Sequence, residues 1–135
     1  MIVVDSNVIA YCWINGERTA LAHRLRRLDP DWHAPLLWRS ELRNILAGYR
    51  RDGSLGGDQI RSIMAAAEAG LAGCEHHLPS DRVFSVIEGG RLSAYDAEFV
   101  ALAEILGVRL VTEDRAILTA CPERASTLEN AVAIQ

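Results

Sequence analysis

Short apolar runs alternate with segments of helical periodicity along the whole chain. Runs of four or five consecutive apolar residues are typical of buried strands, whereas apolar residues spaced three and four positions apart indicate helices. Strands that alternate with helices form mainly parallel sheets with helices on both faces, so an α/β fold is expected. The pattern predicts strands at residues 1–5, 32–35, 74–78, 108–112 and 131–134, and helices at 17–28, 37–51, from 58, 80–88, 93–106 and from 115.

Two of the predicted helices show the signals on which these assignments depend. Leu21, Leu25 and Leu28 recur at positions i, i+4 and i+7, which indicates an amphipathic helix. Ser93 opens a later helix as its N-cap, and Gly107 ends that helix as glycine commonly does.

The length of the chain suits one domain that spans residues 1–135. Half of the residues are hydrophobic, enough for a sizeable core. No apolar run approaches the roughly 18 residues that a membrane span needs. The first four residues are apolar, Asp5 follows them, and no basic stretch precedes them. This pattern does not resemble a signal peptide. A cytoplasmic protein without a membrane partner is therefore expected.

The charge of the chain is not that of a typical nucleic-acid binder, because its formal net charge is −4. All 14 basic residues are arginine, whose planar fork suits phosphate, although genomic base composition also produces lysine-free chains. Arg50 and Arg51, at the end of a predicted helix, are the best candidates for RNA phosphate contacts. Compensation of the helix dipole explains them equally well.

The cysteines and histidines show no spacing that predicts a metal site. Three widely separated cysteines argue against a disulfide framework or a zinc site, and buried thiols are the simpler interpretation. Structural or surface roles are expected for the histidines, since a zinc site needs a convergent set of ligands. These residues are Cys12, Cys74 and Cys121, and His23, His33, His76 and His77.

Acidic residues lie near the predicted carboxyl ends of the strands. Asp5 ends the first strand, Asp114 follows the fourth, and Glu41 is early in the helix after the second. Asp96 lies in the first turn of the helix that leads into the fourth strand, so topology alone places it less directly. Ligands of parallel α/β sheets bind outside the carboxyl ends of the strands. We therefore expect these acids to meet at one edge of the sheet.

Each acid also has a purely structural explanation. Asp96 completes a capping pattern with Ser93, and Asp114 has the position of a helix N-cap. Glu41 is placed to pair with Arg39 or Arg43 at the helix surface. Asp5 is the hardest to explain in this way, because a carboxylate directly after a buried strand needs a partner or a cation.

A convergent set of carboxylates without histidine or cysteine favours Mg²⁺ or Mn²⁺ over Zn²⁺. Crowded carboxylates raise one another's pKa, and a divalent cation removes their repulsion. Such a site can activate water and stabilise a leaving oxygen in phosphodiester hydrolysis. The residues therefore point to a metal-dependent hydrolase of phosphate esters.

Four blocks of the sequence, in order and over nearly the whole chain, resemble the PIN-domain family. Its VapC-type toxins of toxin–antitoxin pairs are the most similar in length. The blocks are Val3-Val4-Asp5-Ser6-Asn7-Val8, Pro35-Leu36-Leu37-Trp38-Arg39-Ser40-Glu41-Leu42-Arg43-Asn44-Ile45-Leu46, Ser93-Ala94-Tyr95-Asp96-Ala97-Glu98-Phe99-Val100-Ala101-Leu102-Ala103 and Leu110-Val111-Thr112-Glu113-Asp114-Arg115-Ala116-Ile117-Leu118.

The resemblance implies a three-layer α/β/α sandwich with a central parallel sheet and an endoribonuclease that cleaves RNA. It implies that Mg²⁺ or Mn²⁺ is carried by the catalytic acids, that Thr112 orients Asp114 or a bound water, and that the protein forms a homodimer. A small antitoxin that inserts a basic side chain into the acidic site is the expected partner. The acids are Asp5, Glu41, Asp96 and Asp114, with Ser6, Asn7, Asn44 and Thr112 as supporting residues.

Two other functions remain open at this point. A PIN-like fold that binds RNA or a protein without cleavage is the first, and the complete set of acids speaks against it. The second is a phosphatase on a Rossmann-like sheet, whose nucleophilic Asp is followed two residues later by another Asp. That position holds Asn7 here. A P-loop or dinucleotide site lacks its glycine motif.

Overall fold

The computed structural model describes residues 1–134, in which five strands form one sheet with the order β3-β2-β1-β4-β5. All neighbouring strands are parallel, as the alternation of strands and helices predicts. The central position of β1 places Val3 beside both His33 and Leu110. The strands are β1 (Ile2–Val4), β2 (Trp32–Pro35), β3 (Glu75–His76), β4 (Leu110–Val111) and β5 (Ala125–Ser126).

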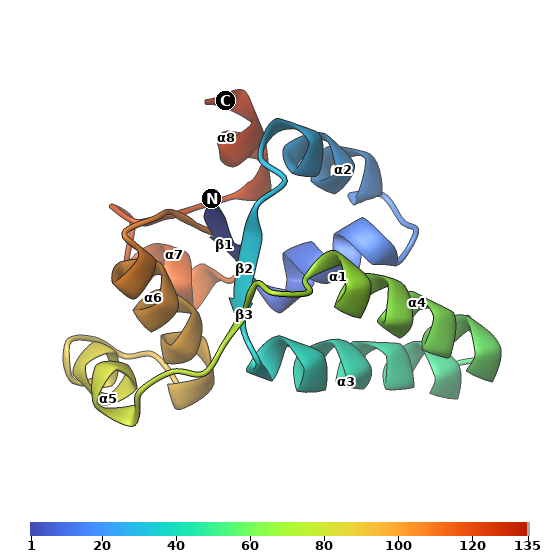
Figure 1. The fold of residues 1–135 in the computed structure, drawn as a ribbon, viewed down its shortest axis with the longest axis horizontal. Helices are drawn as coiled ribbons and strands as arrows, with labels where there is room; N and C mark the ends of the chain where they lie inside the picture. Colours follow the sequence, from blue (N-terminus) through green and yellow to red (C-terminus); the bar gives the residue numbers. More distant parts are fainter. Residues whose placement is uncertain (135) are drawn as a thin grey trace.

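Helices cover both faces of this sheet, so the predicted α/β/α sandwich is confirmed (Figure 1). On one face α6 packs against β1, β2 and β4, with α5 beside it, while α1 to α4 pack together on the other. No helix of the described residues is long and apolar enough to cross a membrane. The helices are α1 (Ser6–Trp13), α2 (Thr19–Leu28), α3 (Leu37–Arg51), α4 (Gly57–Gly70), α5 (Ser80–Glu88), α6 (Ala94–Leu106), α7 (Arg115–Ala120) and α8 (Leu128–Ala133).

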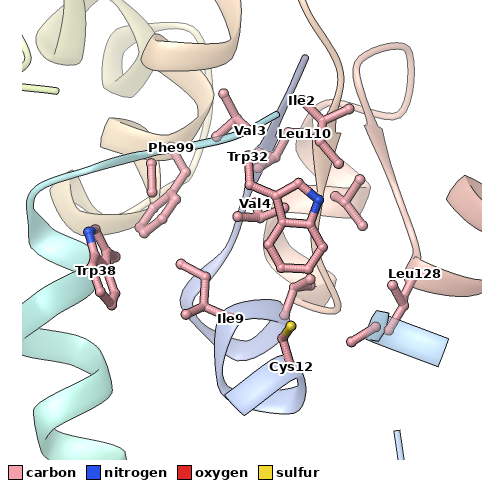
Figure 2. Packing of buried hydrophobic residues seen from close by; sticks show 14 of the residues in the cluster. Ile2, Val3, Val4, Ile9, Cys12, Trp32, Trp38, Phe99, Leu110 and Leu128 are labelled. Carbon is pink, nitrogen blue, oxygen red and sulfur yellow. The ribbon is translucent and has the colours of Figure 1, made fainter. Parts of the chain in front are cut away.

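The main hydrophobic core surrounds β1, whose three residues are all buried. Side chains from both helical layers reach it, and Figure 2 shows Ile9 of α1, Trp32 of β2 and Phe99 of α6 in the same cluster as Val4. A central parallel strand buried on both faces reads as a continuous apolar run, which explains why this strand is clear in the sequence. Burial of each such large side chain contributes roughly 1.5–3 kcal/mol.

Most of the predicted helix boundaries agree with the structure. The hydroxyl of Ser93 caps α6 by accepting a hydrogen bond from a backbone N–H one turn later, and Gly107 ends the helix with a φ of 67°. In α2 the predicted apolar face is correct for the fully buried Leu25. Leu28, the last residue of that helix, is 44% exposed, because the buried face ends one turn earlier.

Two assignments from the sequence are wrong. Helix α1 is not predicted, because its β-branched and aromatic residues are weak helix formers and five of its eight residues are buried, leaving no polar face. The strand predicted at 131–134 is instead part of α8, which Thr127 caps through the N–H of Asn130. Leu128, Ala131 and Val132 are buried at helical spacing, and the last strand is β5.

Candidate active site

An open cavity of about 390 Å³ lies at the carboxyl end of the sheet and brings together the acids predicted from the sequence. Asp5 directly follows β1, and Asp114 follows β4 as the N-cap of α7. Glu41 comes from α3 and Asp96 from the first turn of α6. The cavity is lined by Asp5, Ser6, Asn7, Leu37, Ser40, Glu41, Asn44, Ile45, Tyr95, Asp96 and Asp114.

Asp5 is the most deeply buried of these acids, with 8% of its surface exposed. The fully buried Thr112 donates a hydrogen bond from Oγ1 to Oδ2 of Asp5. Burial raises the pKa of Asp5, and hydrogen bonds from Thr112 and from the backbone of Ser6 and Asn7 oppose that rise. The carboxylate is therefore fixed in orientation but costly to ionise, as expected of a group that binds a cation.

Glu41 is held by the N-terminus of α1, because Oγ of Ser6 donates to Oε1 of Glu41 at 2.7 Å. Burial raises the pKa of Glu41, the hydrogen bond from Ser6 opposes that rise, and the nearby charges of Asp5, Asp96 and Glu98 add smaller increases.

A surface ion pair, the structural explanation for Glu41, is not found. Arg39 is engaged by Glu75 and Glu68, and among the described residues Glu41 forms no ion pair within 4.0 Å. The half-buried Glu41 is therefore available to the cavity.

Asp96 reaches the cavity from α6, although α6 comes before β4 in the chain and does not follow the carboxyl end of a strand directly. Its backbone N–H donates to Oγ of Ser93 at 3.1 Å, so the capping pattern in the sequence is real. That pattern does not explain why its carboxyl group lines the cavity. Burial raises the pKa of Asp96, and the neighbouring charges of Asp114 and Asp5 raise it further.

Asp114 combines the two roles between which the sequence left a choice. Its Oδ1 accepts from the backbone N–H of Ile117 at 3.1 Å, which caps α7, and the residue also lines the cavity. Its own backbone N–H donates to Oγ1 of Thr112 at 2.9 Å. Thr112 therefore acts on the backbone of Asp114 and on the carboxylate of Asp5, whereas the resemblance suggested an action on Asp114 or a water.

The remaining predicted residues divide into two groups. Asn7 and Asn44 line the cavity, as expected of supporting residues. Arg50 and Arg51 do not line it; Arg50 is nine residues beyond Glu41 on α3, roughly 13 Å along the helix. Tyr95, which is 64% exposed at the cavity, is not among the residues predicted from the sequence, although its place directly before Asp96 is a usable signal.

The donor set of the cavity fits a hard divalent cation, because its four acids come without histidine or cysteine. Within residues 1–134 no three of these acids offer oxygens that all lie within 4.8 Å of one another. A hard cation such as Mg²⁺ does not require such a close group, since it keeps several waters and takes one or two carboxylates together with substrate phosphate. Ligand atoms that do lie this close together belong to Asp31, His33 and Cys74, outside this cavity.

Comparisons with known proteins agree with the resemblance in the sequence. The chain is 27% identical over 124 residues to ribonuclease VapC3 of Pyrobaculum aerophilum, covering 90% of this chain and 95% of that protein. Its fold is similar to the crystal structure of FitAcB from Neisseria gonorrhoeae, with a TM-score of 0.69, 18% identity, and coverage of 96% and 99% of the two chains. A comparison with models of known protein families found no match. The chain is therefore similar over most of its length to a VapC ribonuclease, and its fold is similar to that of FitAcB.

Proposed function

We propose that the chain is a metal-dependent endoribonuclease that hydrolyses RNA phosphodiester bonds as the toxin of a toxin–antitoxin pair. The observation that carries this proposal is the convergence of Asp5, Glu41, Asp96 and Asp114 on one open cavity. The sequence similarity to a ribonuclease over 90% of the chain supports the same activity. Mg²⁺ or Mn²⁺ bound there would supply an activated water and charge stabilisation at the phosphate.

The chain's own residues prepare this site before substrate arrives. Thr112 fixes the carboxylate of Asp5, and Ser6 fixes that of Glu41, so neither has to be ordered when a cation binds. Without a cation the cavity is negative and would repel the phosphates of RNA. The exposed ring of Tyr95 offers a surface on which an unpaired RNA base could stack. We therefore propose that RNA binding in the cavity depends on the metal.

Cleavage of RNA by the purified chain tests the proposed function directly. Single-stranded and structured RNA should be cut in the presence of Mg²⁺ or Mn²⁺, and excess chelator should abolish the cleavage because the carboxylates alone supply no positive charge to stabilise the phosphate and the leaving oxygen. Binding of RNA without any cleavage at saturating metal would instead support the non-cleaving binding module. Hydrolysis of small phosphate monoesters with intact RNA would support the phosphatase alternative.

We propose that Arg50 and Arg51 contact RNA phosphates outside the cavity. Both are exposed at the end of α3, the helix that carries Glu41 and Asn44 on the cavity wall. Loss of two phosphate contacts should make RNA binding less dependent on salt. For a single strand, the slope of the logarithm of the binding constant against the logarithm of the salt concentration should fall in magnitude by about 0.7 per contact. Binding by Asp5→Asn and by the same variant with Arg50→Ala and Arg51→Ala, measured over a salt series, tests this. An unchanged slope would rule these arginines out.

An antitoxin is the expected restraint on such an enzyme, and the acidic cavity suggests how it binds. We propose that the antitoxin inserts an arginine or lysine near Asp5 and Asp96, since one cation donor can satisfy several carboxylates. Neutralising the basic residues of the antitoxin's binding segment should abolish inhibition of cleavage. Inhibition that persists after their replacement would show that the antitoxin acts elsewhere.

Three further features do not depend on the geometry of the site. We propose that residues 1–135 fold as a single PIN-like domain, that two copies form a homodimer, and that the protein acts on RNA in the cytoplasm. Measurement of the molar mass in solution tests the homodimer, and a monomeric mass at micromolar concentration would contradict it.

A further inference from the structure

A second cluster of metal-ligating side chains lies toward the amino ends of β2 and β3, away from the acidic cavity. Asp31 precedes β2, His33 lies within β2, and Cys74 directly precedes β3. One ligand atom from each of these residues lies within 4.8 Å of the other two. Because the cavity is at the carboxyl end of the same parallel sheet, this cluster is a separate site.

The register of the sheet explains why these side chains meet. Ala34 pairs with Glu75, so the preceding residues of the two strands, His33 and Cys74, lie side by side. Successive side chains of a strand point to opposite faces, so Asp31 shares the face of His33.

The neighbouring residues in each strand point to the other face. Trp32 packs edge-on against Trp13 of α1, and Glu75 binds Arg39 of α3. The cluster is therefore produced by strand alternation and pairing across 43 residues of sequence.

His33 is oriented from both sides of its ring. Its Nε2 lies 2.8 Å from Oδ1 of Asp31, and its Nδ1 lies 2.8 Å from Nε2 of His76. A carboxylate has no proton to donate, so Nε2 carries the proton when it faces Asp31 alone. A metal ion at Nε2 would replace that proton, and Nδ1 would then donate to His76. A histidine ligand whose second nitrogen donates to a fixed acceptor is the usual arrangement at protein metal sites.

The distances in the cluster are close to those of a zinc site. Zinc bonds of about 2.0–2.3 Å to oxygen, nitrogen and sulfur place neighbouring tetrahedral ligands roughly 3.3–3.7 Å apart. Oδ1 of Asp31 lies 2.8 Å from Nε2 of His33 and 4.0 Å from Sγ of Cys74. Binding would require small adjustments of both separations, and Asp31 is free to make them because its side chain is 47% exposed.

We propose that Asp31, His33 and Cys74 form a binding site for Zn²⁺, with His76 as a positioning residue and water in the fourth place. Thiolate and imidazole select a borderline-soft ion such as Zn²⁺ over the Mg²⁺ or Mn²⁺ that suits the all-oxygen cavity. Two negative ligands, a carboxylate and a thiolate, would balance the charge of the ion. The bound ion would link β2 to β3, the two-residue strand at the edge of the sheet.

Cobalt provides a spectroscopic test, because a thiolate bound to Co²⁺ gives a charge-transfer band that an all-oxygen site cannot give. The full chain carrying Asp5→Asn and Asp96→Asn, which weakens the acidic cavity, is titrated with Co²⁺ and then with Zn²⁺. One Co²⁺ per chain with a thiolate band, displaced by Zn²⁺, is the expected result. Absence of a thiolate band would overturn the proposal.

Variants assign the ligands. Cys74→Ser should remove the thiolate band, whereas Cys121→Ser, the matched change at another half-buried thiol, should retain it. His76→Gln should keep the band and weaken Co²⁺ binding about 10- to 100-fold, the usual effect of losing a residue that orients a ligand. A band that survives Cys74→Ser, or is lost in Cys121→Ser, would contradict the assignment.

Chemical protection of the unmodified chain gives a readout that does not depend on the folding of variants. Zn²⁺ should slow alkylation of Cys74 at least tenfold and leave the rate at Cys121 unchanged, as measured by mass mapping of the labelled peptides. Equal rates at Cys74 with and without Zn²⁺ would overturn the proposal, whatever the result of the RNA cleavage assay.

Discussion

Asp5→Asn is expected to lower RNA cleavage by more than about 100-fold, beyond the 10- to 100-fold typical of residues that only orient a ligand. The amide retains the shape of the side chain and can still accept the hydrogen bond from Thr112, but it loses the charge that attracts the cation. Asp96→Asn and Asp114→Asn should have similar effects for the same reason. Initial rates at saturating Mn²⁺, with circular dichroism to confirm folding, measure the change.

Asp81→Asn is a matched control for this series. Asp81 lies in the first turn of α5, as Asp96 does in α6, but it is exposed and lies outside the cavity. Loss of a helix-dipole interaction would affect both variants equally, whereas loss of a metal ligand would affect only Asp96→Asn. Activity near that of the wild type in any two of the three cavity variants would refute the assignment of the site.

The second large effect is expected on stability, because the cavity carboxylates are crowded when no cation is bound. The pKa values of Asp5, Glu41 and Asp96 are raised, first by burial and then by neighbouring acids. The folded chain therefore binds protons more readily than the unfolded chain. Its free energy of unfolding should fall as pH rises from about 4, the pKa of unfolded carboxylates, through the raised folded values.

Removal of one of the crowded charges should restore part of the free energy of unfolding that is lost as pH rises. In chelator above the raised pKa values, Asp96→Asn should increase the free energy of unfolding by at most about 1 kcal/mol, since Asp96 is partly exposed and its repulsion is screened. At low pH, where the carboxyl group is protonated, the gain should disappear. The variant keeps the backbone N–H that Ser93 accepts, so the cap of α6 is not lost.

Added Mn²⁺ should also stabilise the folded state, but mainly that of the wild type. A ligand present at 100 times its dissociation constant stabilises the folded state by about 2.7 kcal/mol, so the wild type should gain this amount and Asp96→Asn much less. Thermal and urea unfolding with chelator and with Mn²⁺ measure both effects, with Asp81→Asn as the control. A variant that is less stable than the wild type in chelator and responds equally to Mn²⁺ would identify Asp96 as a structural residue alone.

Local sequence determined four of the five strands, most helices and three of the cavity acids. Central parallel strands are buried on both faces, so β1 is a continuous apolar run whose end is marked by Asp5. The carboxyl ends of parallel strands share one edge, so the acids that follow β1 and β4 had to lie near each other once the sheet was assigned. Glu41 follows β2 in the same way, at the second turn of α3.

Only the tertiary structure decided the features that depend on packing between distant segments. Asp96 reaches the cavity because α6 packs across β1, β2 and β4, which no local pattern specifies. Helix α1 forms although its residues favour helix weakly, because burial of most of its side chains outweighs a propensity difference of less than about 1 kcal/mol per residue.

The cluster of Asp31, His33 and Cys74 shows the same limit most clearly. Spacing along the chain argued against a metal site, because the cysteines are widely separated and no histidine has a metal-ligand spacing; Cys74 is 43 residues from Asp31. The pairing of β2 with β3 brings them together, and strand alternation turns them to one face. Pairing register is set by the packing of the whole sheet rather than by either strand alone, so this site could be found only in the folded chain.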